Sequence, residues 1–137
     1  MQSASFQLRD YQFVKVELDN DRLKNNDINV SFDVAGEYSV EQSAFELKFE
    51  AGASSEGENS SFVSVTCLAN FTFENVTSLE DIPDYFYQNA IAIVFPYIRA
   101  YISLVTTQAN VKPIILPTLN LSQLTTPLKG NTTLKSN

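Results

Sequence analysis

The residue types that carry most enzyme chemistry are scarce in this chain of 137 residues. Histidine, the commonest general base and metal ligand, is absent. Cys67 is the only cysteine, so the chain can form neither an internal disulfide nor a cysteine-based zinc site. Cys67 also occupies an inward position of a predicted strand with no histidine to activate it, so we interpret it as a core residue. We therefore expect no catalytic residue, no metal site and no cofactor.

Two groups of acidic side chains also have non-catalytic interpretations. Glu46 and Glu50 lie on one face of a predicted strand with Lys48 between them. They could be posed as a pair of catalytic carboxylates, but we favour a solvated face whose charges compensate one another. The second group precedes the longest apolar segment, and it suits the positive end of a helix dipole better than a metal site: Glu80, Asp81 and Asp84.

The bulk composition indicates a folded chain with an acidic surface. The hydrophobic fraction is 44%, the charged fraction 18% and the net charge −7. Such a charge repels nucleic acid and anionic lipid, which need clusters of Lys and Arg. The first residues lack the basic and apolar regions of a signal peptide, so we expect a cytoplasmic protein. The length suits one domain, which we place at residues 1–124.

Alternation of apolar and polar residues predicts three strands with one buried face each. Polar turn-rich stretches at 19–27, 36–42 and 52–61 separate them, and connections this short favour antiparallel neighbours. The segment Phe6 to Leu18 has apolar residues on both parities, which indicates a strand that is central or covered by a partner, or else a bulge near Asp10 to Gln12. The inward residues of the three alternating strands are Ile28, Val30, Phe32 and Val34, then Phe45, Leu47, Phe49 and Ala51, then Val63, Val65, Cys67, Ala69, Phe71 and Phe73.

A long helix is predicted from Asp84 to about Thr107, with Pro83 suited to its first turn and Pro96 kinking or dividing it. Between Ala90 and Val105 the helix is apolar nearly all round, so both of its faces must be buried. A membrane span does not fit a short run broken by Pro96 and Arg99, which leaves burial between subunits. The predicted interface comprises Ile91, Val94, Phe95, Tyr97, Ile98, Arg99, Tyr101, Ile102 and Val105. For Arg99 we expect a structural role at that contact, with a functional role as the alternative.

The remainder of the chain is predicted to be a crossover loop, a short helix and a tail. Pro113 and Pro117 forbid regular helix between Ala109 and Asn120, although the segment stays apolar and must pack on something. Asn120 offers a cap for a short helix through Leu124. We expect residues 125–137 to be disordered. The fold class is therefore α+β, a four-stranded antiparallel sheet followed by the long helix, the crossover and the short helix.

The sequence of the second half of the chain resembles that of the protein-export chaperone SecB and its relatives. The resemblance is carried by Phe95-Pro96-Tyr97-Ile98-Arg99 and by Pro117-Thr118-Leu119-Asn120-Leu121, and it is closest between Ala90 and Leu124. It implies a homotetramer, a dimer of dimers whose long helices lie between sheets. It also implies that non-native polypeptides bind in extended form, without ATP, in apolar grooves near the crossover and the second strand.

Carried onto this chain, the resemblance implies client-binding residues in the crossover and in two strands. The export members carry a zinc-binding tail that docks on the motor SecA, whereas residues 125–137 contain neither cysteine nor histidine. This departure leaves the export motor as a doubtful partner and suggests a dedicated client, such as an antitoxin. The implied client-binding residues are Ile114, Ile115, Leu116, Leu119, Leu121 and Leu124, with Tyr11, Phe13, Val30 and Phe32.

The leading hypothesis is thus a SecB-like holding chaperone that binds unfolded polypeptides for protein transport or for one client. Each client-binding residue has an ordinary core role as its alternative. An oligomeric structural or adaptor protein without a client groove is the second hypothesis. A carrier of small molecules on a curved sheet is the third.

Overall fold

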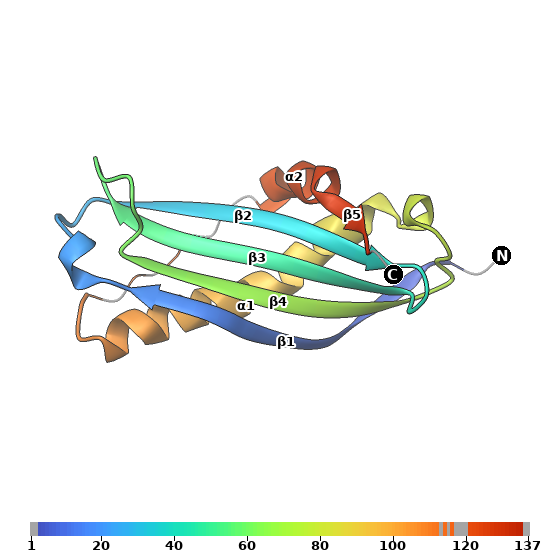
Figure 1. Cartoon of the computed structure of the whole chain (residues 1–137), viewed down its shortest axis with the longest axis horizontal. Coiled ribbons are helices and arrows are strands. Elements are labelled where there is room, and N and C mark those ends of the chain that lie inside the picture. Colours follow the sequence, from blue (N-terminus) through green and yellow to red (C-terminus); the bar gives the residue numbers. More distant parts are fainter. Residues whose placement is uncertain (1–2, 113, 115, 117–120, 136–137) are drawn as a thin grey trace.

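The protein, described here from a computed structural model, folds as one long sheet with a long helix across one face (Figure 1). The structure describes residues 3–112, 114, 116 and 121–135. The sheet has the order β1-β4-β3-β2-β5, in which β5 runs parallel to β2 and the other pairs are antiparallel. The elements are β1 (Ser5–Leu18), β2 (Ile28–Ser39), β3 (Ala44–Ser55), β4 (Val63–Glu74), α1 (Asp84–Gln108), α2 (Thr125–Gly130) and β5 (Thr132–Leu134), with short 3-10 turns at Asn20–Arg22, Leu79–Asp81 and Leu121–Leu124.

The predicted order of four antiparallel strands, a long helix and a short C-terminal helix is confirmed. The predicted turns at 36–42 and 52–61 are wrong in part, because β2 continues to Ser39 and β3 to Ser55. Gly36 was the misleading signal: it is needed for packing, since a Cβ there would come within 2.9 Å of Thr132 Oγ1 and still closer to the Phe45 ring. The turn itself lies between β2 and β3, where Ser43 adopts a φ of 48°.

β1 keeps its apolar side chains on the helix side by means of two β-bulges. Its register with β4 shifts between Leu8 and Asp10 and again between Phe13 and Lys15. Each bulge inserts one residue, Arg9 or Val14, and so corrects the parity of the residues that follow. A bulged strand is therefore confirmed, although the bulges flank the predicted position at Asp10 to Gln12. A central strand is wrong, because β1 lies at the edge of the sheet.

α1 is one continuous helix, so Pro96 does not divide it. Phe86, in its first turns, packs edge-on against Phe45 at 4.9 Å and Phe73 at 4.8 Å between ring centroids, and Phe6 and Phe71 complete the cluster. By length and composition α1 could cross a membrane, but its inner face packs on the sheet as in a core helix. The buried residues of α1 are Phe86, Tyr87, Ala90, Ile91, Val94, Phe95, Ile98, Ile102 and Thr106.

The predicted boundary at residue 124 and the predicted disordered tail are corrected by α2 and β5. Leu128 of α2 is fully buried in the main core. β5 pairs with the end of β2, and Asn131 Nδ2 donates a hydrogen bond of 3.2 Å to the carbonyl oxygen of Val34. Lys129 Nζ pairs with Asp84 Oδ1 at 2.6 Å and ties α2 to the start of α1. The polar composition of the tail predicted disorder, because it gives little weight to a single buried leucine and none to pairing with β2, which is distant in sequence.

Replacing Gly36 by alanine should destabilise the fold, because the new methyl group overlaps Phe45 and Thr132. Overpacking of this kind costs about 1–3 kcal/mol of unfolding free energy, measured by urea denaturation. Gly130→Ala is the matched control, since a Cβ at Gly130 meets nothing within 4 Å. Equal stability of the Gly36→Ala and Gly130→Ala variants would contradict the packing role of Gly36.

Candidate functional site

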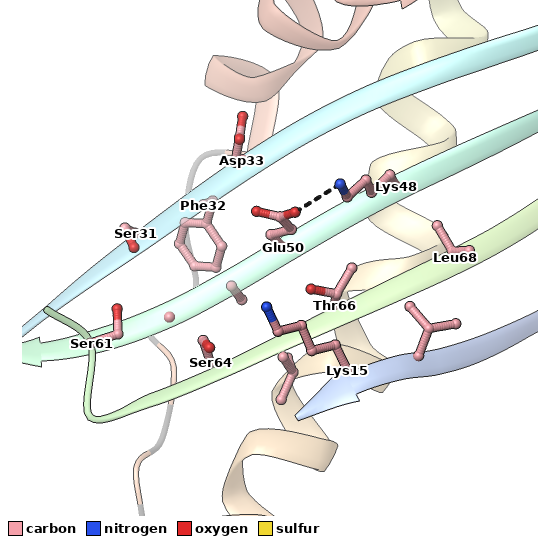
Figure 2. Close-up of a pocket in the computed structure, with 14 residues that line it drawn as sticks. Lys15, Ser31, Phe32, Asp33, Lys48, Glu50, Ser61, Ser64, Thr66 and Leu68 are labelled. Atoms are coloured by element: carbon pink, nitrogen blue, oxygen red, sulfur yellow. Dashed lines mark ion pairs between the residues drawn. The ribbon is translucent and has the colours of Figure 1, made fainter. Parts of the chain in front are cut away.

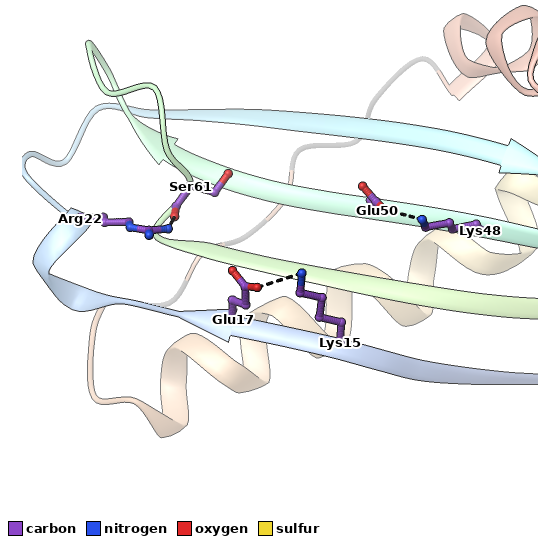
Figure 3. Close-up of polar contacts among 6 residues, drawn as sticks. All are labelled: Lys15, Glu17, Arg22, Lys48, Glu50 and Ser61. Atoms are coloured by element: carbon purple, nitrogen blue, oxygen red, sulfur yellow. Dashed lines mark hydrogen bonds and ion pairs between the residues drawn. The ribbon is translucent and has the colours of Figure 1, made fainter.

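The outer face of the sheet, which points away from α1, is polar, and its positive and negative side chains pair with one another. It carries an open hollow lined mostly by hydroxyl and charged side chains of β1, β2, β3 and β4 (Figure 2). Lys48 Nζ pairs with Glu50 Oε1 at 3.1 Å and Lys15 Nζ with Glu17 Oε1 at 3.0 Å (Figure 3). The interpretation of Lys48 and its glutamates as a solvated, compensated face is thus supported.

No group in the described part of the chain has the arrangement of a catalytic or metal centre. Within those residues no set of three or more Cys, Asp and Glu side chains could hold a metal ion. The Cys67 side chain is fully buried, and burial raises the pKa of its thiol, which disfavours the reactive thiolate. Cys67 is therefore a core residue, as expected.

The acidic residues before α1 serve local structure. Thr77 donates hydrogen bonds to Asp81 from its hydroxyl at 2.8 Å and its amide at 3.2 Å, and these hydrogen bonds lower the pKa of Asp81. Asp84 opens α1 and accepts the ion pair from Lys129, whose pKa is raised by that contact. These positions agree with the interpretation of helix-start residues, although none of them caps α1 with its side chain.

The face of α1 that points away from the sheet is an exposed apolar stripe. Ile93 is 37% exposed and Leu104 52% exposed. Both belong to a row of exposed residues that recur every three or four positions along one face of the helix. A soluble chain rarely leaves a row of this kind uncovered. We call it the outer helix face; it consists of Ile93, Pro96, Ala100 and Leu104.

The residues predicted for a subunit interface fall on different sides of α1. A group of them is buried against the sheet of the same chain, which corrects their assignment: Ile91, Val94, Phe95, Ile98 and Ile102. Tyr97, Tyr101 and Val105 are exposed or half-buried, and Arg99 is half-buried with no ion pair to another described residue. The sequence missed Ile93 and Leu104, because a helix apolar all round gives no periodic signal to separate its faces.

Two stacked aromatic pairs join the edge strand β1 to α1. The rings of Tyr11 and Tyr97 lie 4.2 Å apart at 22°, and those of Phe13 and Tyr101 lie 4.1 Å apart at 16°. Tyr11 is 41% and Tyr97 39% exposed, so this pair presents an open apolar surface beside the outer helix face. Tyr11 and Phe13 do not lie with the other client-binding candidates, since β4 and β3 separate β1 from β2.

β2 and the crossover come together near the edge of the sheet opposite β1. Val30 and Ile114, both half-buried, pack on the same small cluster of Ala53, Phe62 and Val63. Phe32 packs edge-on against Phe95, with 5.9 Å between ring centroids. We call the exposed parts of Val30, Phe32 and Ile114 the β2–crossover surface.

α1 anchors the crossover at Ile114 by two hydrogen bonds. The hydroxyl of Ser103 donates to the carbonyl oxygen of Ile114 at 2.9 Å, and the amide of Ile114 donates to Thr106 Oγ1 at 3.0 Å. Thr106 is fully buried, so this anchor is shielded from water. These two contacts could not be predicted from the sequence, because they join Ser103 and Thr106 of the helix to a backbone group outside it, which no periodic pattern reports.

The remaining client-binding candidates divide between core, surface and residues outside the described chain. Leu116 is fully buried and belongs to the core in this conformation, which corrects its assignment to an accessible groove. Leu124 is half-buried and packs on the same core. Ile115, Leu119 and the side chain of Leu121 lie outside the described residues.

Comparison with known proteins gives three findings. The family model described as preprotein translocase subunit SecB matches residues 9–127. An uncharacterized protein of Methanocaldococcus jannaschii is 53% identical over 34 residues, which are 25% of this chain and 22% of that protein. The solved structure of a SecB-like chaperone of Mycobacterium tuberculosis, in complex with a peptide from the HigA1 antitoxin, has a TM-score of 0.69 and 19% identity. The similarity covers 84% of this chain and 88% of that one, and it demonstrates a common fold.

The burial of Cys67 predicts that a thiol reagent such as dithionitrobenzoate will not label the native protein at neutral pH. Burial both blocks access and raises the pKa of the thiol, so the reactive thiolate is scarce. Absorbance of the released thionitrobenzoate should rise only after urea is added. Prompt, stoichiometric labelling without urea would contradict the core position of Cys67.

Proposed function

Because this chain belongs to the SecB family of chaperones, which are not enzymes, we propose that it is a holding chaperone for unfolded or non-native polypeptides. It acts without ATP and keeps its clients in extended form. Burial of client side chains at about 25 cal/mol per Å² supplies the affinity. The protein acts in the cytoplasm, where its acidic surface disfavours nucleic acid and anionic membranes.

The proposal rests chiefly on the β2–crossover surface. Val30, Phe32 and Ile114 are contributed by segments far apart in sequence, yet they present apolar side chains side by side and half-exposed. An extended chain is bound more readily by a shallow surface of this kind than by a deep pocket. Ile115, Leu119 and Leu121 remain client-binding candidates in our proposal.

The outer helix face supports assembly of several copies. We place a second α1 against Ile93, Pro96, Ala100 and Leu104, in a dimer of dimers whose long helices lie between the sheets. The interface candidates that stay exposed or half-buried in the single chain are Tyr97, Arg99, Tyr101 and Val105. Assembly by this face removes the exposed apolar stripe from water, which favours it energetically.

One solved structure bears on the client and the downstream partner. We favour a dedicated client, such as an antitoxin, over general export through the motor SecA. The peptide complex of the similar mycobacterial chaperone is in keeping with this preference.

The same outer helix face also supports the second candidate, an oligomeric adaptor without a client groove. The two functions differ in what the β2–crossover surface does. In a chaperone this surface binds other polypeptides, whereas in an adaptor it is only a part of the fold.

Charged residues on the outer helix face should dissociate the assembly. We predict that Ile93→Glu with Leu104→Glu will lower the molar mass measured by light scattering to that of a smaller species, because carboxylates cannot be buried unpaired. Stability of the single chain should change little, since both side chains are exposed. The matched control is Tyr85→Glu, at an exposed residue of the same helix outside the defined stripe. An unchanged mass would contradict assembly through this face.

Polar residues in the crossover should abolish holding but leave assembly intact. We predict that Ile115→Ser with Leu119→Ser will fail to suppress aggregation of a refolding test protein, followed by light scattering, while the oligomer mass stays the same. Val40→Ser, at a 54% exposed residue of the β2–β3 turn, is the control and should hold normally. Loss of assembly in the crossover variant would favour the adaptor, and full holding activity would contradict the proposed client site.

A further inference from the structure

The free edge of β2 is only partly covered by the chain itself. In the sheet β2 lies between β3 and β5, and β5 pairs only with Gly36, Glu37 and Tyr38. The part of β2 that begins at Ile28 therefore extends beyond its short neighbour (Figure 1). Its pairing with β3 is continuous from Ile28 to Ser39 without a bulge, so alternate backbone groups point to alternate sides.

The hydrogen bonds of the covered part fix which groups point outward. The amide of Gly36 donates to the Asn131 carbonyl oxygen at 3.2 Å, and the Tyr38 carbonyl oxygen accepts from the Lys135 amide at 2.8 Å. The Val34 carbonyl oxygen accepts from Asn131 Nδ2 on the same side. The Asp27 carbonyl oxygen, of opposite parity, accepts from Glu56 beyond β3.

The same parity places the amides and carbonyl oxygens of Ile28, Val30 and Phe32 on the outer edge. These groups have no hydrogen-bond partner among the described residues. A row of unpaired backbone groups is a template for another strand. Proteins commonly blunt such edges with bulges or prolines, and β2 has neither.

The chain shows at β5 that this edge accepts a strand. β5 is three residues long and is held by few bonds, and Leu134 at its end is 55% exposed. Asn131 ends the covered part by bonding Val34, which leaves the uncovered row directly in line with β5. The side chains beside that row on the helix side, Val30 and Phe32, belong to the β2–crossover surface.

We propose that the β2 edge from Ile28 to Phe32 binds an extended segment of a non-native polypeptide as an added strand. Backbone hydrogen bonds to Ile28, Val30 and Phe32 give affinity that is independent of sequence. Alternate apolar side chains of the segment lie beside Val30, Phe32 and Ile114. Its other side chains lie beside Asn29, Ser31 and Asp33, so neutral or basic residues fit there. This inference rests on the proposed holding function and adds the mode of recognition.

Hydrogen exchange of the unmodified protein tests the proposal. The probe is a short blocked peptide of alternating valine and threonine with lysine at each end. Saturating peptide should slow exchange of the Val30 and Phe32 amides by about tenfold or more, as expected for new hydrogen bonds. The Ser31 and Asp33 amides point towards β3 and serve as internal controls. Peptide binding with unchanged exchange at Val30 and Phe32 would overturn this inference and leave the holding function standing.

Two variants at one position separate the backbone from the side chain. Val30→Pro removes the outward amide and is compatible with an edge position, whereas Val30→Ala removes only the side chain. The peptide should bind Val30→Pro about tenfold more weakly than Val30→Ala. Equal affinities would overturn the strand-addition mode. If Val30→Pro does not fold, as judged by circular dichroism, the exchange experiment decides alone.

Two further outcomes are distinguishable. A lower oligomer mass for folded Val30→Pro than for Val30→Ala would mean that a second copy of this chain occupies the edge, and it would overturn the inference. If neither the peptide nor an unfolded protein bound to the unmodified chain, the proposed holding function itself would fail, and the inference with it.

Discussion

The fold depends on the packing of Phe86 in a cluster of aromatic rings. Phe6 of β1, Phe45 of β3, and Phe71 and Phe73 of β4 all contact this ring edge-on. One side chain of α1 thereby joins three strands at the start of the helix. Removing such a buried ring typically costs about 3–5 kcal/mol. Because the helix continues without a break past Pro96, this contact also sets which of its later residues face the sheet.

The division of α1 into two faces follows from that packing and explains what the sequence could and could not predict. The position of the helix and the alternation of the strands were predictable, because periodicity reports local structure, whereas the ends of β2 and β3 were not. The faces of α1 were not, since Ile91 and Ile93 are equally apolar and only contact with the sheet distinguishes them. Likewise Gly36 read as a turn, because its close contact with Phe45 is non-local.

The structure brings some of the predicted client-binding residues together and separates others. Val30, Phe32 and Ile114 do lie near one another, but Leu116 became core and Tyr11 and Phe13 lie on the far edge strand. The tail was misjudged because one leucine, Leu128, and a strand pairing with β2 outweigh its polar composition. The surfaces on which the proposed function rests are those that long-range contacts leave open, and sequence patterns report such contacts weakly.

The bulges of β1 have a consequence for how the gene can tolerate length changes. Without Arg9 and Val14, the apolar residues of β1 would still alternate regularly along one face, because each bulge adds a residue that has no partner on β4. A natural variant that lost either codon would keep every other side chain of the strand on its present face. Loss of Gln12 instead would turn part of the strand inside out. Length variation among relatives should therefore concentrate at these two positions of the strand.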